Sequence, residues 1–413
     1  MTEMIITRNI GKQNSHDISV YVAGGGYKAL TKALQMSSDA IIDEIKRAGL
    51  LGRGGAAFPV AMKWNFVKRE DSYPKYIICN ADEGEPGTFK DRVILKNDPH
   101  LLIEALVIAG YAIGASQGYI YVRGEYYEEI SAVKNAIAQA RGKGYLGQAI
   151  LGSDFSFDVD VYTGAGAYVC GEETSLIESM TGNRACPDCR PPFPAQSGFL
   201  GKPTAVNNVE TLANVPHIID KGADWFAKFG VEGSTGTKLF CLSGHINKPG
   251  LYEIPFGITL GELINDYGGG VKGEFKAALT GGVSSSLVTD MNIKLDYRSV
   301  AAAGSMLGSA SVIVMNKDTD MVDVAVNTVS FFALESCGKC SVCREGTRQA
   351  QKILANLSRG RGRPGDIELL QELGSVLQDT ACCGLGQASM NVPVSAIKYF
   401  RNEFEDRQKE GNR

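Results

Sequence analysis

Residues 76–88 read Tyr-Ile-Ile-Cys-Asn-Ala-Asp-Glu-Gly-Glu-Pro-Gly-Thr, an apolar run that passes directly into a polar loop. The run Tyr76–Cys79 is short and apolar, which predicts a buried strand. The loop then gathers an amide and the carboxyl groups of Asp82, Glu83 and Glu85. Because ligands bind at the carboxyl ends of strands in parallel α/β sheets, the loop is a candidate binding site. A solvated acidic turn is the alternative.

The sequence on either side of this stretch alternates between strand-like and helix-like segments. Strands are expected at Gly118–Val122 and Phe157–Val161, and helices at Tyr27–Met36, Asp39–Ala48, Pro99–Gly114, Glu125–Arg141, Glu172–Met180 and Asn207–Ile219. Such alternation predicts a mostly parallel sheet covered by helices on both faces. We assign residues 1–235 to this α/β domain.

The pattern changes after Gly233–Gly236. Strands at Leu239–Ser243 and Gly250–Ile254 and a helix at Leu260–Tyr267 suggest a small β-grasp-like unit over residues 236–320. Residues 321–413 are expected to be helical. In that region, Arg359–Gly365 is expected to link two helices, and Ala396–Glu410 to form an exposed terminal helix.

Composition narrows the functional classes. The 413 residues are 44% hydrophobic and 21% charged, as in an ordinary globular protein. The net charge of −4 does not indicate nucleic-acid binding, and no long uncharged apolar run predicts insertion into a membrane. The first residues do not resemble a secretory signal, and the ten cysteines suggest metal or redox work in a reducing, cytoplasmic compartment.

The cysteines near the C-terminus carry the strongest chemical signal. Cys337, Cys340 and Cys343 form a C-x-x-C-x-x-C run, and Cys383 follows 40 residues later (383 − 343). Three close thiolates and a distant fourth are a usual ligand set for a [4Fe–4S] cluster, which carries electrons singly. A structural zinc site and a coincidence of buried thiols are the alternatives.

Glycine-rich and amide-rich segments suggest further ligand contacts. Gly52-Arg53-Gly54-Gly55 precedes Lys63 and could present backbone N–H groups to a phosphate, although a tight structural turn would also explain it. The segment Gly164–Thr174 combines a glycine turn with the acidic start of a helix, where simple stabilisation of the helix end is the alternative. The adjacent amides of Asn207 and Asn208 exceed what one helix cap requires.

These motifs occur in a fixed order: Gly52–Phe58, Asn80–Arg92, Gly164–Thr174, Asn207–Thr211 and Cys337 to Cys383. Together they resemble the NADH-binding flavoprotein subunit of respiratory complex I, the 51 kDa family. This family also supplies the diaphorase subunit of NAD-linked [FeFe]-hydrogenases and formate dehydrogenases. The resemblance covers nearly the whole chain. It implies a Rossmann-like domain for FMN and NADH, a ubiquitin-like β-grasp domain and a C-terminal helical bundle with one [4Fe–4S] cluster.

The resemblance also implies roles for individual residues. Those facing the FMN phosphate would be Gly52, Arg53, Gly54, Gly55 and Lys63. Those holding the flavin ring and ribityl chain would be Asn80, Asp82, Gly171, Glu172, Asn207 and Asn208. Those contacting NADH would be Glu83 and Glu173 at the nicotinamide, Glu85 at the adenosine ribose, Phe58, Phe66 and Phe193 around the adenine, and Arg190. The cluster ligands would be Cys337, Cys340, Cys343 and Cys383. Without the resemblance, a core role would be the natural interpretation of each phenylalanine.

The implied activity is that of a diaphorase. NADH would give a hydride to FMN, and single electrons would pass through the cluster to a thioredoxin-like [2Fe–2S] subunit and a larger iron–sulfur subunit. No side chain would act as a nucleophile, and Glu85 would select against NADPH. Two alternatives stay open: an electron-bifurcating or reversible hydrogenase module that works with ferredoxin, and a non-catalytic ligand-binding subunit.

The chain departs from the family pattern at several positions. Ala57 replaces a glycine, Gly84 a serine, and Arg190 a lysine. The pair in Cys186-Pro187-Asp188-Cys189 is not required by the family; it could be inert packing, a redox-responsive disulfide or part of a metal site. Cys382 lies beside Cys383, and the resemblance favours Cys383 as the ligand.

Overall fold

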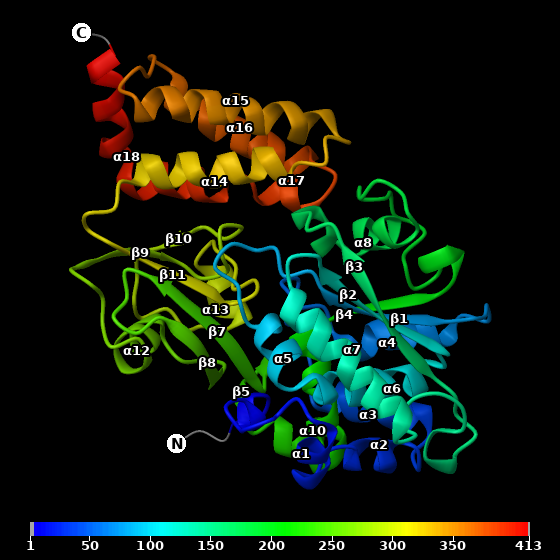
Figure 1. The fold of residues 1–413 in the computed structure, drawn as a ribbon. Coiled ribbons are helices and arrows are strands. Elements are labelled where there is room, and N and C mark those ends of the chain that lie inside the picture. Colours follow the sequence, from blue (N-terminus) through cyan, green and yellow to red (C-terminus); the bar gives the residue numbers. More distant parts are fainter. Residues whose placement is uncertain (1–3, 412–413) are drawn as a thin grey trace.

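A parallel sheet forms one half of the molecule in this computed structural model, which describes residues 4–411. Its strands are β1 (Tyr76–Ala81), β2 (Gln117–Arg123), β3 (Asp158–Gly164) and β4 (Thr204–Asn208), in the order β3-β2-β1-β4 (Figure 1). The chain runs from β1 outward to β3 and then returns to the other side of β1. The strand order therefore reverses between β1 and β4, and such a reversal opens a crevice at the carboxyl ends of the strands.

Helices cover both faces of this sheet. The first helices are α1 (Ile18–Ala23), α2 (Lys28–Ala33), α3 (Ser38–Arg47), α4 (Val60–Arg69), α5 (Asp91–Asn97), α6 (Pro99–Ile113), α7 (Tyr127–Gly142), α8 (Glu173–Met180), α9 (Val209–Ala213), α10 (Val215–Lys221) and α11 (Ala223–Phe226). Short 3-10 turns span Thr7–Asn9, Ile150–Gly152, Tyr168–Gly171 and Phe199–Gly201.

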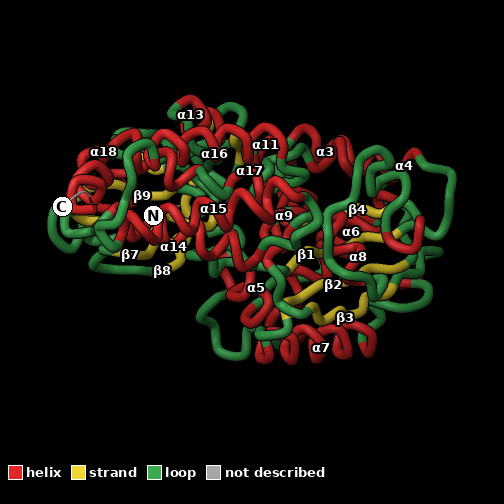
Figure 2. Tube along the Cα trace, turned by 90° about the horizontal axis from the view of Figure 1, so that it is seen from above, coloured by secondary structure: helices red, strands yellow, loops and turns green. Residues whose placement is uncertain are grey.

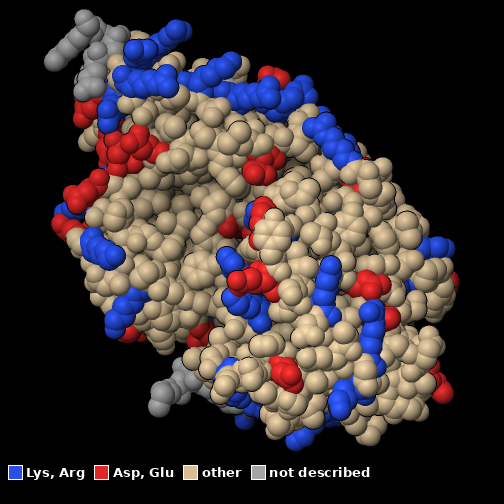
Figure 3. Space-filling view, viewed as in Figure 1, with Lys and Arg blue, Asp and Glu red and all other residues tan. Residues whose placement is uncertain are grey.

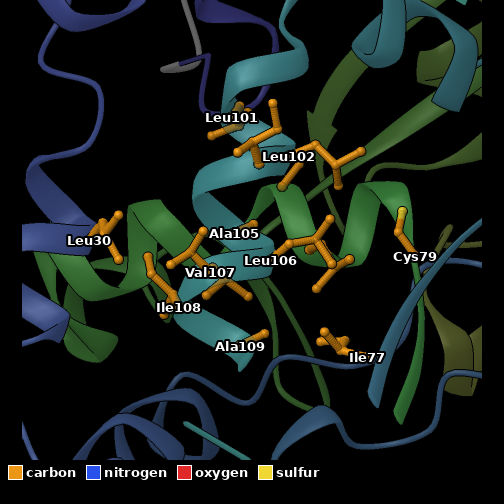
Figure 4. Close-up of a cluster of buried hydrophobic side chains, with 14 of the residues drawn as sticks. Leu30, Ile77, Cys79, Leu101, Leu102, Ala105, Leu106, Val107, Ile108 and Ala109 are labelled. Carbon is orange, nitrogen blue, oxygen red and sulfur yellow. The ribbon is translucent and has the colours of Figure 1, made fainter. Parts of the chain in front are cut away.

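Helix α6 is the centre of the larger core. All of its residues except Tyr111 are buried, as expected for a helix that is apolar on every side. Figure 4 shows Leu102 and Leu106 of α6 in the same cluster as Ile77 and Cys79 of β1. The opposite face of the sheet, which includes Ile78, packs instead on α8.

The three predicted strands of this sheet are present, but one prediction was wrong. The segment Asn207–Ile219 was expected to be entirely helical, whereas Thr204–Asn208 forms β4. A buried strand of five residues has no diagnostic period, and the side chain of Asn208 caps the helix that follows.

A second, mixed sheet adjoins the first half. Its strands are β7 (Thr237–Gly244), β8 (Gly250–Pro255), β9 (Phe275–Leu279), β10 (Leu287–Val288) and β11 (Ser311–Asn316), in the order β10-β9-β11-β7-β8. It carries α12 (Leu260–Glu262), a π-helical turn (Leu263–Tyr267) and α13 (Tyr297–Ala302), and a small ribbon of β5 (Gly230–Val231) and β6 (Ser234–Thr235) precedes it. The separate core beneath this sheet agrees with the β-grasp expectation.

The C-terminal region is helical and lies over the second sheet (Figures 1 and 2). It consists of α14 (Met321–Glu335), α15 (Ser341–Ser358), α16 (Asp366–Thr380), α17 (Gly384–Ala388) and α18 (Asn391–Gly411), with residues 359–365 linking α15 to α16 as predicted. Helix α18 is less exposed than expected, because Ala396, Ile397 and Phe404 are buried. Within residues 4–411, no helix is long and apolar enough to cross a membrane.

Candidate functional site

Three loops of the parallel sheet meet at the reversal of strand order. Asn80 near the end of β1 pairs in register with Asn208 at the end of β4. The Asn80 side-chain amide also donates to the carbonyl of Gly171, at 3.0 Å, in the loop before α8. The motifs after β1, β3 and β4 are therefore neighbours at one edge of the sheet.

Asp82 is the clearest sign that this edge binds a ligand. Both of its carboxyl oxygens are buried and have no hydrogen-bond partner among the described residues. Burial raises the pKa of Asp82 to about 7, although the Arg123 guanidinium acts in the opposite direction. A buried carboxyl group without a donor is costly, so a ligand that carries hydroxyl groups fits this position. The ribityl chain of FMN is such a ligand.

The glycine-rich loop contributes backbone to the same edge. The Arg53 N–H donates to the hydroxyl of Thr211 at 2.8 Å, and a Cβ at Gly54 would come within 3.0 Å of Asn208. No atom would contact a Cβ at Gly55 or Gly171, so the backbone there faces open space. The Arg53 guanidinium, in contrast, is buried over the ring of Phe256 and donates to the carbonyl of Thr235 at 2.6 Å. The structure therefore brings the backbone of this loop to the crevice, but not the arginine charge.

Charged side chains gather at the start of α8. Glu172 caps the helix by accepting from the N–H groups of Thr174 and Ser175. Stabilisation of the helix end therefore accounts for part of its role. Glu173 instead forms ion pairs with Lys63 at 2.9 Å and with Arg190 at 3.3 Å, and Arg190 also pairs with Glu172. The Lys63 ammonium lies 2.9 Å from a carboxylate here, so it is held at the crevice by a protein partner.

The three phenylalanines are not core residues. Phe58, Phe66 and Phe193 are 41%, 46% and 51% exposed. The ammonium of Lys63 lies 6.0 Å from the centre of the Phe58 ring, which places that ring near the charged group at α8. Large exposed aromatic rings beside a charged crevice are suited to stacking on a planar ligand.

The remaining acidic residues of the first loop are engaged within the protein. Glu83 accepts from the N–H groups of Asp91 and Arg92 at the start of α5, and burial raises its pKa to about 7. Glu85 accepts from the hydroxyl of Tyr168 at 2.6 Å and from the N–H of Ser284 at 2.9 Å. Burial raises the pKa of Glu85, and these hydrogen bonds oppose the rise.

Tyr168 was missed as an individual residue by the sequence reasoning, although it lies within the motif Gly164–Thr174. The nearby Gly84, where the family usually has serine, is the signal that points to it. A Cβ at Gly84 would come within 3.0 Å of the Tyr168 ring and 3.2 Å of its Cα. The absence of a side chain at Gly84 therefore leaves the space that the Tyr168 ring occupies.

A buried charge network supports the end of β4. Asn208 donates to Asp91 at 2.6 Å and accepts from Lys90 at 3.2 Å. Lys90 also pairs with Glu210 at 3.1 Å, and Glu210 pairs with Lys238 of β7. Burial lowers the pKa of Lys238 to about 8, against the effect of Glu210. The network connects the crevice to the second sheet.

Asn207 is held separately, since its side-chain oxygen accepts from the indole N–H of Trp64 at 2.9 Å.

The C-terminal cysteines line one hollow. Cys337, Cys340 and Cys343 come from the loop before α15 and its first turn, and Cys382 and Cys383 come from the loop before α17. Burial raises the pKa of the Cys383 thiol, and the backbone N–H groups of Leu385 and Gly386 act in the opposite direction. Burial acts to raise the pKa of Cys340, but the N–H groups of Cys382 and Cys343 hold it below its usual value.

This donor set fits an iron–sulfur cluster, which takes cysteine thiolates as ligands. Amide donors directed at sulfurs stabilise thiolate ligands and are a feature of iron–sulfur sites. Among residues 4–411, no three His, Cys, Asp or Glu side chains converge closely enough to bind one metal ion. Cys382 is exposed, whereas Cys383 is partly buried.

Comparisons with known proteins agree with these sites. Family models match residues 45–217 ("Nuo51 FMN-binding domain"), residues 238–324 ("SLBB domain") and residues 323–407 ("NADH-ubiquinone oxidoreductase-F iron-sulfur binding region"). The chain is 49% identical, over 98% of its length and 97% of the relative, to the F 2 subunit of NADH-quinone oxidoreductase from Rhizobium meliloti. It is 47% identical, over 97% of its length and 82% of the relative, to the HndC subunit of the NADP-reducing hydrogenase from Solidesulfovibrio fructosivorans.

A solved structure shows a similar fold. The crystal structure of NAD⁺-reducing [NiFe]-hydrogenase in the H₂-reduced state matches with a TM-score of 0.84 and 36% sequence identity. The match covers 91% of this chain and 64% of the hydrogenase chain, so the present chain spans less than two thirds of that chain.

Proposed function

Since the chain belongs to the family of F-type subunits of NADH-quinone oxidoreductase, we propose that it oxidises NADH with FMN at the crevice between β1 and β4 and passes single electrons to a [4Fe–4S] cluster. It is an FMN-binding oxidoreductase subunit with an iron–sulfur region. The observation that carries the proposal is the buried, unpartnered carboxyl group of Asp82 at the reversal of strand order.

The chain's own residues would hold and orient the flavin. Asp82 would accept from ribityl hydroxyl groups, with Asn80, Asn207 and Asn208 beside it. The open backbone at Gly55 and Gly171 would allow close approach of the phosphate and ring. FMN, when bound, would supply the redox chemistry that amino-acid side chains cannot: it accepts a hydride from NADH and releases electrons one at a time.

The substrate would enter beside α4 and α8. The exposed rings of Phe58, Phe66 and Phe193 would stack on the adenine. Lys63 would face the FMN phosphate and Arg190 would contact NADH. Both side chains now pair with Glu173, so each would give up part of that ion pair when its ligand binds. Glu85 would accept from the adenosine ribose and repel a 2′-phosphate, and Glu83 and Glu173 would lie beside the nicotinamide.

The cluster would be held by Cys337, Cys340, Cys343 and Cys383. The partial burial of Cys383 in the hollow supports this set, and the exposure of Cys382 speaks against its use as the fourth ligand. Within the implied units, residues 1–235, 236–320 and 321–413, the loop with the cluster cysteines would lie beside the flavin crevice, since Lys339 donates to the carbonyl of Pro187 and Arg184 to that of Cys337.

The relatives are parts of larger assemblies, so this chain is also one component of such an assembly. We propose a thioredoxin-like [2Fe–2S] subunit and a larger iron–sulfur subunit as partners, in the cytoplasm or in the peripheral arm of a membrane complex. A basic ridge that follows the outer side of α15 is complementary in charge to an acidic surface on an electron-accepting partner (Figure 3). The ridge consists of exposed residues of α15 (Arg348 and Lys352) and of the link that follows it (Arg359, Arg361 and Arg363), and no ion pair of these residues occurs within the described side chains. It begins next to the cysteine loop, where electrons would leave.

Co-purification of the native complex tests the proposal. The complex should contain FMN and iron and should oxidise NADH in the presence of an artificial acceptor. Assays with and without ferredoxin separate simple NADH oxidation from the hydrogenase-linked alternative, which is favoured by the similarity to a hydrogenase component. A colourless complex without flavin or iron would contradict the proposal.

A further inference from the structure

The turn between β9 and β10 reaches across to the loop after β1. The Ser284 N–H donates to one oxygen of the Glu85 carboxylate at 2.9 Å, and the Ser284 hydroxyl donates to the other oxygen at 2.8 Å. Gly282 of the same turn has a φ of +77°, and a Cβ there would come within 2.4 Å of this carboxylate. The turn therefore packs directly against Glu85, and Ser284 holds the carboxylate by both of its oxygens.

Helix α18 holds the turn in place from the helical region. The side-chain amide of Asn391, at the start of α18, donates to the carbonyl of Ser284 at 2.7 Å. About one helical turn later, the hydroxyl of Ser395 accepts from the N–H of Leu287 at 3.0 Å. Ser284 is thus fixed through its carbonyl by α18, while its N–H and hydroxyl fix Glu85.

These contacts form one chain of hydrogen bonds from α18 to the nucleotide crevice. Asn391 and Ser284 are 107 positions apart in the sequence, and Ser284 and Glu85 are 199 positions apart. No local backbone preference can set such contacts. The position of the Glu85 carboxylate therefore depends on how the helical region packs on the second sheet.

We propose that Asn391 is a positioning residue that, through Ser284, holds the Glu85 carboxylate where it selects NADH over NADPH. The inference rests on the proposed role of Glu85 at the adenosine ribose. Repulsion of a 2′-phosphate weakens with distance, and a hydrogen bond to the ribose requires a defined distance, so selection needs a fixed carboxylate. Without the Asn391 donor, the Ser284 peptide is free to shift and the selection relaxes.

The test is steady-state kinetics with NADH and with NADPH, on the full-length chain in its native complex. Asn391→Leu removes the donor and keeps the approximate size, Asn391→Ala removes the whole amide, and Ser284→Ala removes a donor to Glu85 itself. Asn391→Leu is also combined with Glu85→Gln. Asn316→Ala is the matched control, because the Asn316 amide donates to a different carbonyl, that of Lys272, at 3.0 Å. Flavin and iron contents are measured for every variant.

Both Asn391 variants should raise the ratio of kcat/KM for NADPH to that for NADH. The expected rise is roughly two- to tenfold, as for the loss of one neutral hydrogen bond, and smaller than the rise in Glu85→Gln. Ser284→Ala should act in the same direction. In the Glu85→Gln background, Asn391→Leu should cause no further rise, because both changes act on one interaction. Asn316→Ala should leave the ratio unchanged.

Three results would overturn the inference. The first is an unchanged ratio in both Asn391 variants when Glu85→Gln shifts it. The second is an equal rise from Asn391→Leu in the Glu85→Gln background, because Asn391 would then act on another group. The third is loss of flavin from both Asn391 variants, which would show a general structural role.

The premise is tested separately. An unchanged ratio in Glu85→Gln itself would remove Glu85 from the nucleotide pocket, and the inference with it. A native complex without flavin and without NADH oxidation would instead reject the proposed function, so the failures are distinguishable.

Discussion

The phenolic hydroxyl of Tyr168 lies 2.6 Å from a carboxylate oxygen of Glu85 and donates to it. Ser284, from the segment between β9 and β10, donates to the same carboxylate through its N–H at 2.9 Å and its hydroxyl at 2.8 Å. The loops after β1 and β3 and the second sheet therefore meet at one carboxylate. This arrangement holds a negative charge at the junction of the two sheets.

Exchange of Glu85 for glutamine should relax the preference for NADH. The amide keeps the approximate shape but removes the charge that would repel a 2′-phosphate. The ratio of kcat/KM for NADPH to that for NADH should rise by about ten- to a hundredfold, the equivalent of roughly 1.5–3 kcal/mol. Glu274→Gln, at an exposed ion pair with Lys317, is the control. An unchanged ratio would remove Glu85 from the nucleotide pocket.

The fourth cluster ligand can be identified by comparing adjacent cysteines. Cys383→Ala should abolish the EPR signal of the cluster, because Cys383 is partly buried in the hollow with the other proposed ligands. Cys382→Ala should retain the signal, because Cys382 is exposed. Equal loss in both variants, or loss only at Cys382, would contradict the assignment.

Flavin binding should depend on pH through Asp82. Its pKa is about 7 in the protein without ligand, mainly because of burial. Hydroxyl donors of a bound ribityl chain favour the carboxylate, so binding releases a proton and the affinity for FMN should fall as the pH drops below about 7. Fluorescence titrations at several pH values should show this slope in the unchanged protein. Asp82→Asn should bind more weakly and without the slope; the same slope in the variant would reject the role.

Asp82 should also affect the stability of the flavin-free protein. Its pKa is raised from 3.8 to about 7 on folding, so the native state binds more protons than the unfolded state between these values. Stability from this group is therefore lost as the pH rises through that window. Asp82→Asn should stabilise the flavin-free protein at pH 8, by about 4 kcal/mol at 1.36 kcal/mol per pH unit, and have little effect at pH 4. Urea unfolding at both pH values measures the difference.

Removal of the Glu210 side chain should destabilise the junction between the sheets. Glu210 is fully buried and pairs with Lys90 and Lys238, so Glu210→Ala leaves two buried ammonium groups without this partner. The expected loss is about 3–5 kcal/mol in the free energy of unfolding. Glu274→Ala, at a solvent-exposed pair, should cost less than about 1 kcal/mol. Similar losses in both variants would show that the network contributes no more than a surface pair.

Much of the fold could be predicted from local pattern. The strand at Tyr76–Ala81 and the helix at Pro99–Ile113 are apolar runs bounded by turn residues, and their positions follow from burial alone. The cysteine spacing similarly predicted a sulfur-rich site, since three thiols within seven residues cannot lie far apart. Strand β4 escaped detection because a strand of five residues, four of them buried in succession, has no diagnostic period.

The use of each site residue was decided by contacts between distant parts of the chain. Glu85 and Ser284 are brought together by the packing of the two sheets, and the same packing buries the Arg53 guanidinium against Phe256. The Arg184 guanidinium reaches the carbonyl of Cys337 only because the helical region lies next to the loop after α8. The sequence by itself determined which elements form and which chemical groups they carry, because these depend on neighbours in the chain. Only the tertiary structure decided which groups meet, because burial and hydrogen bonding depend on neighbours in space.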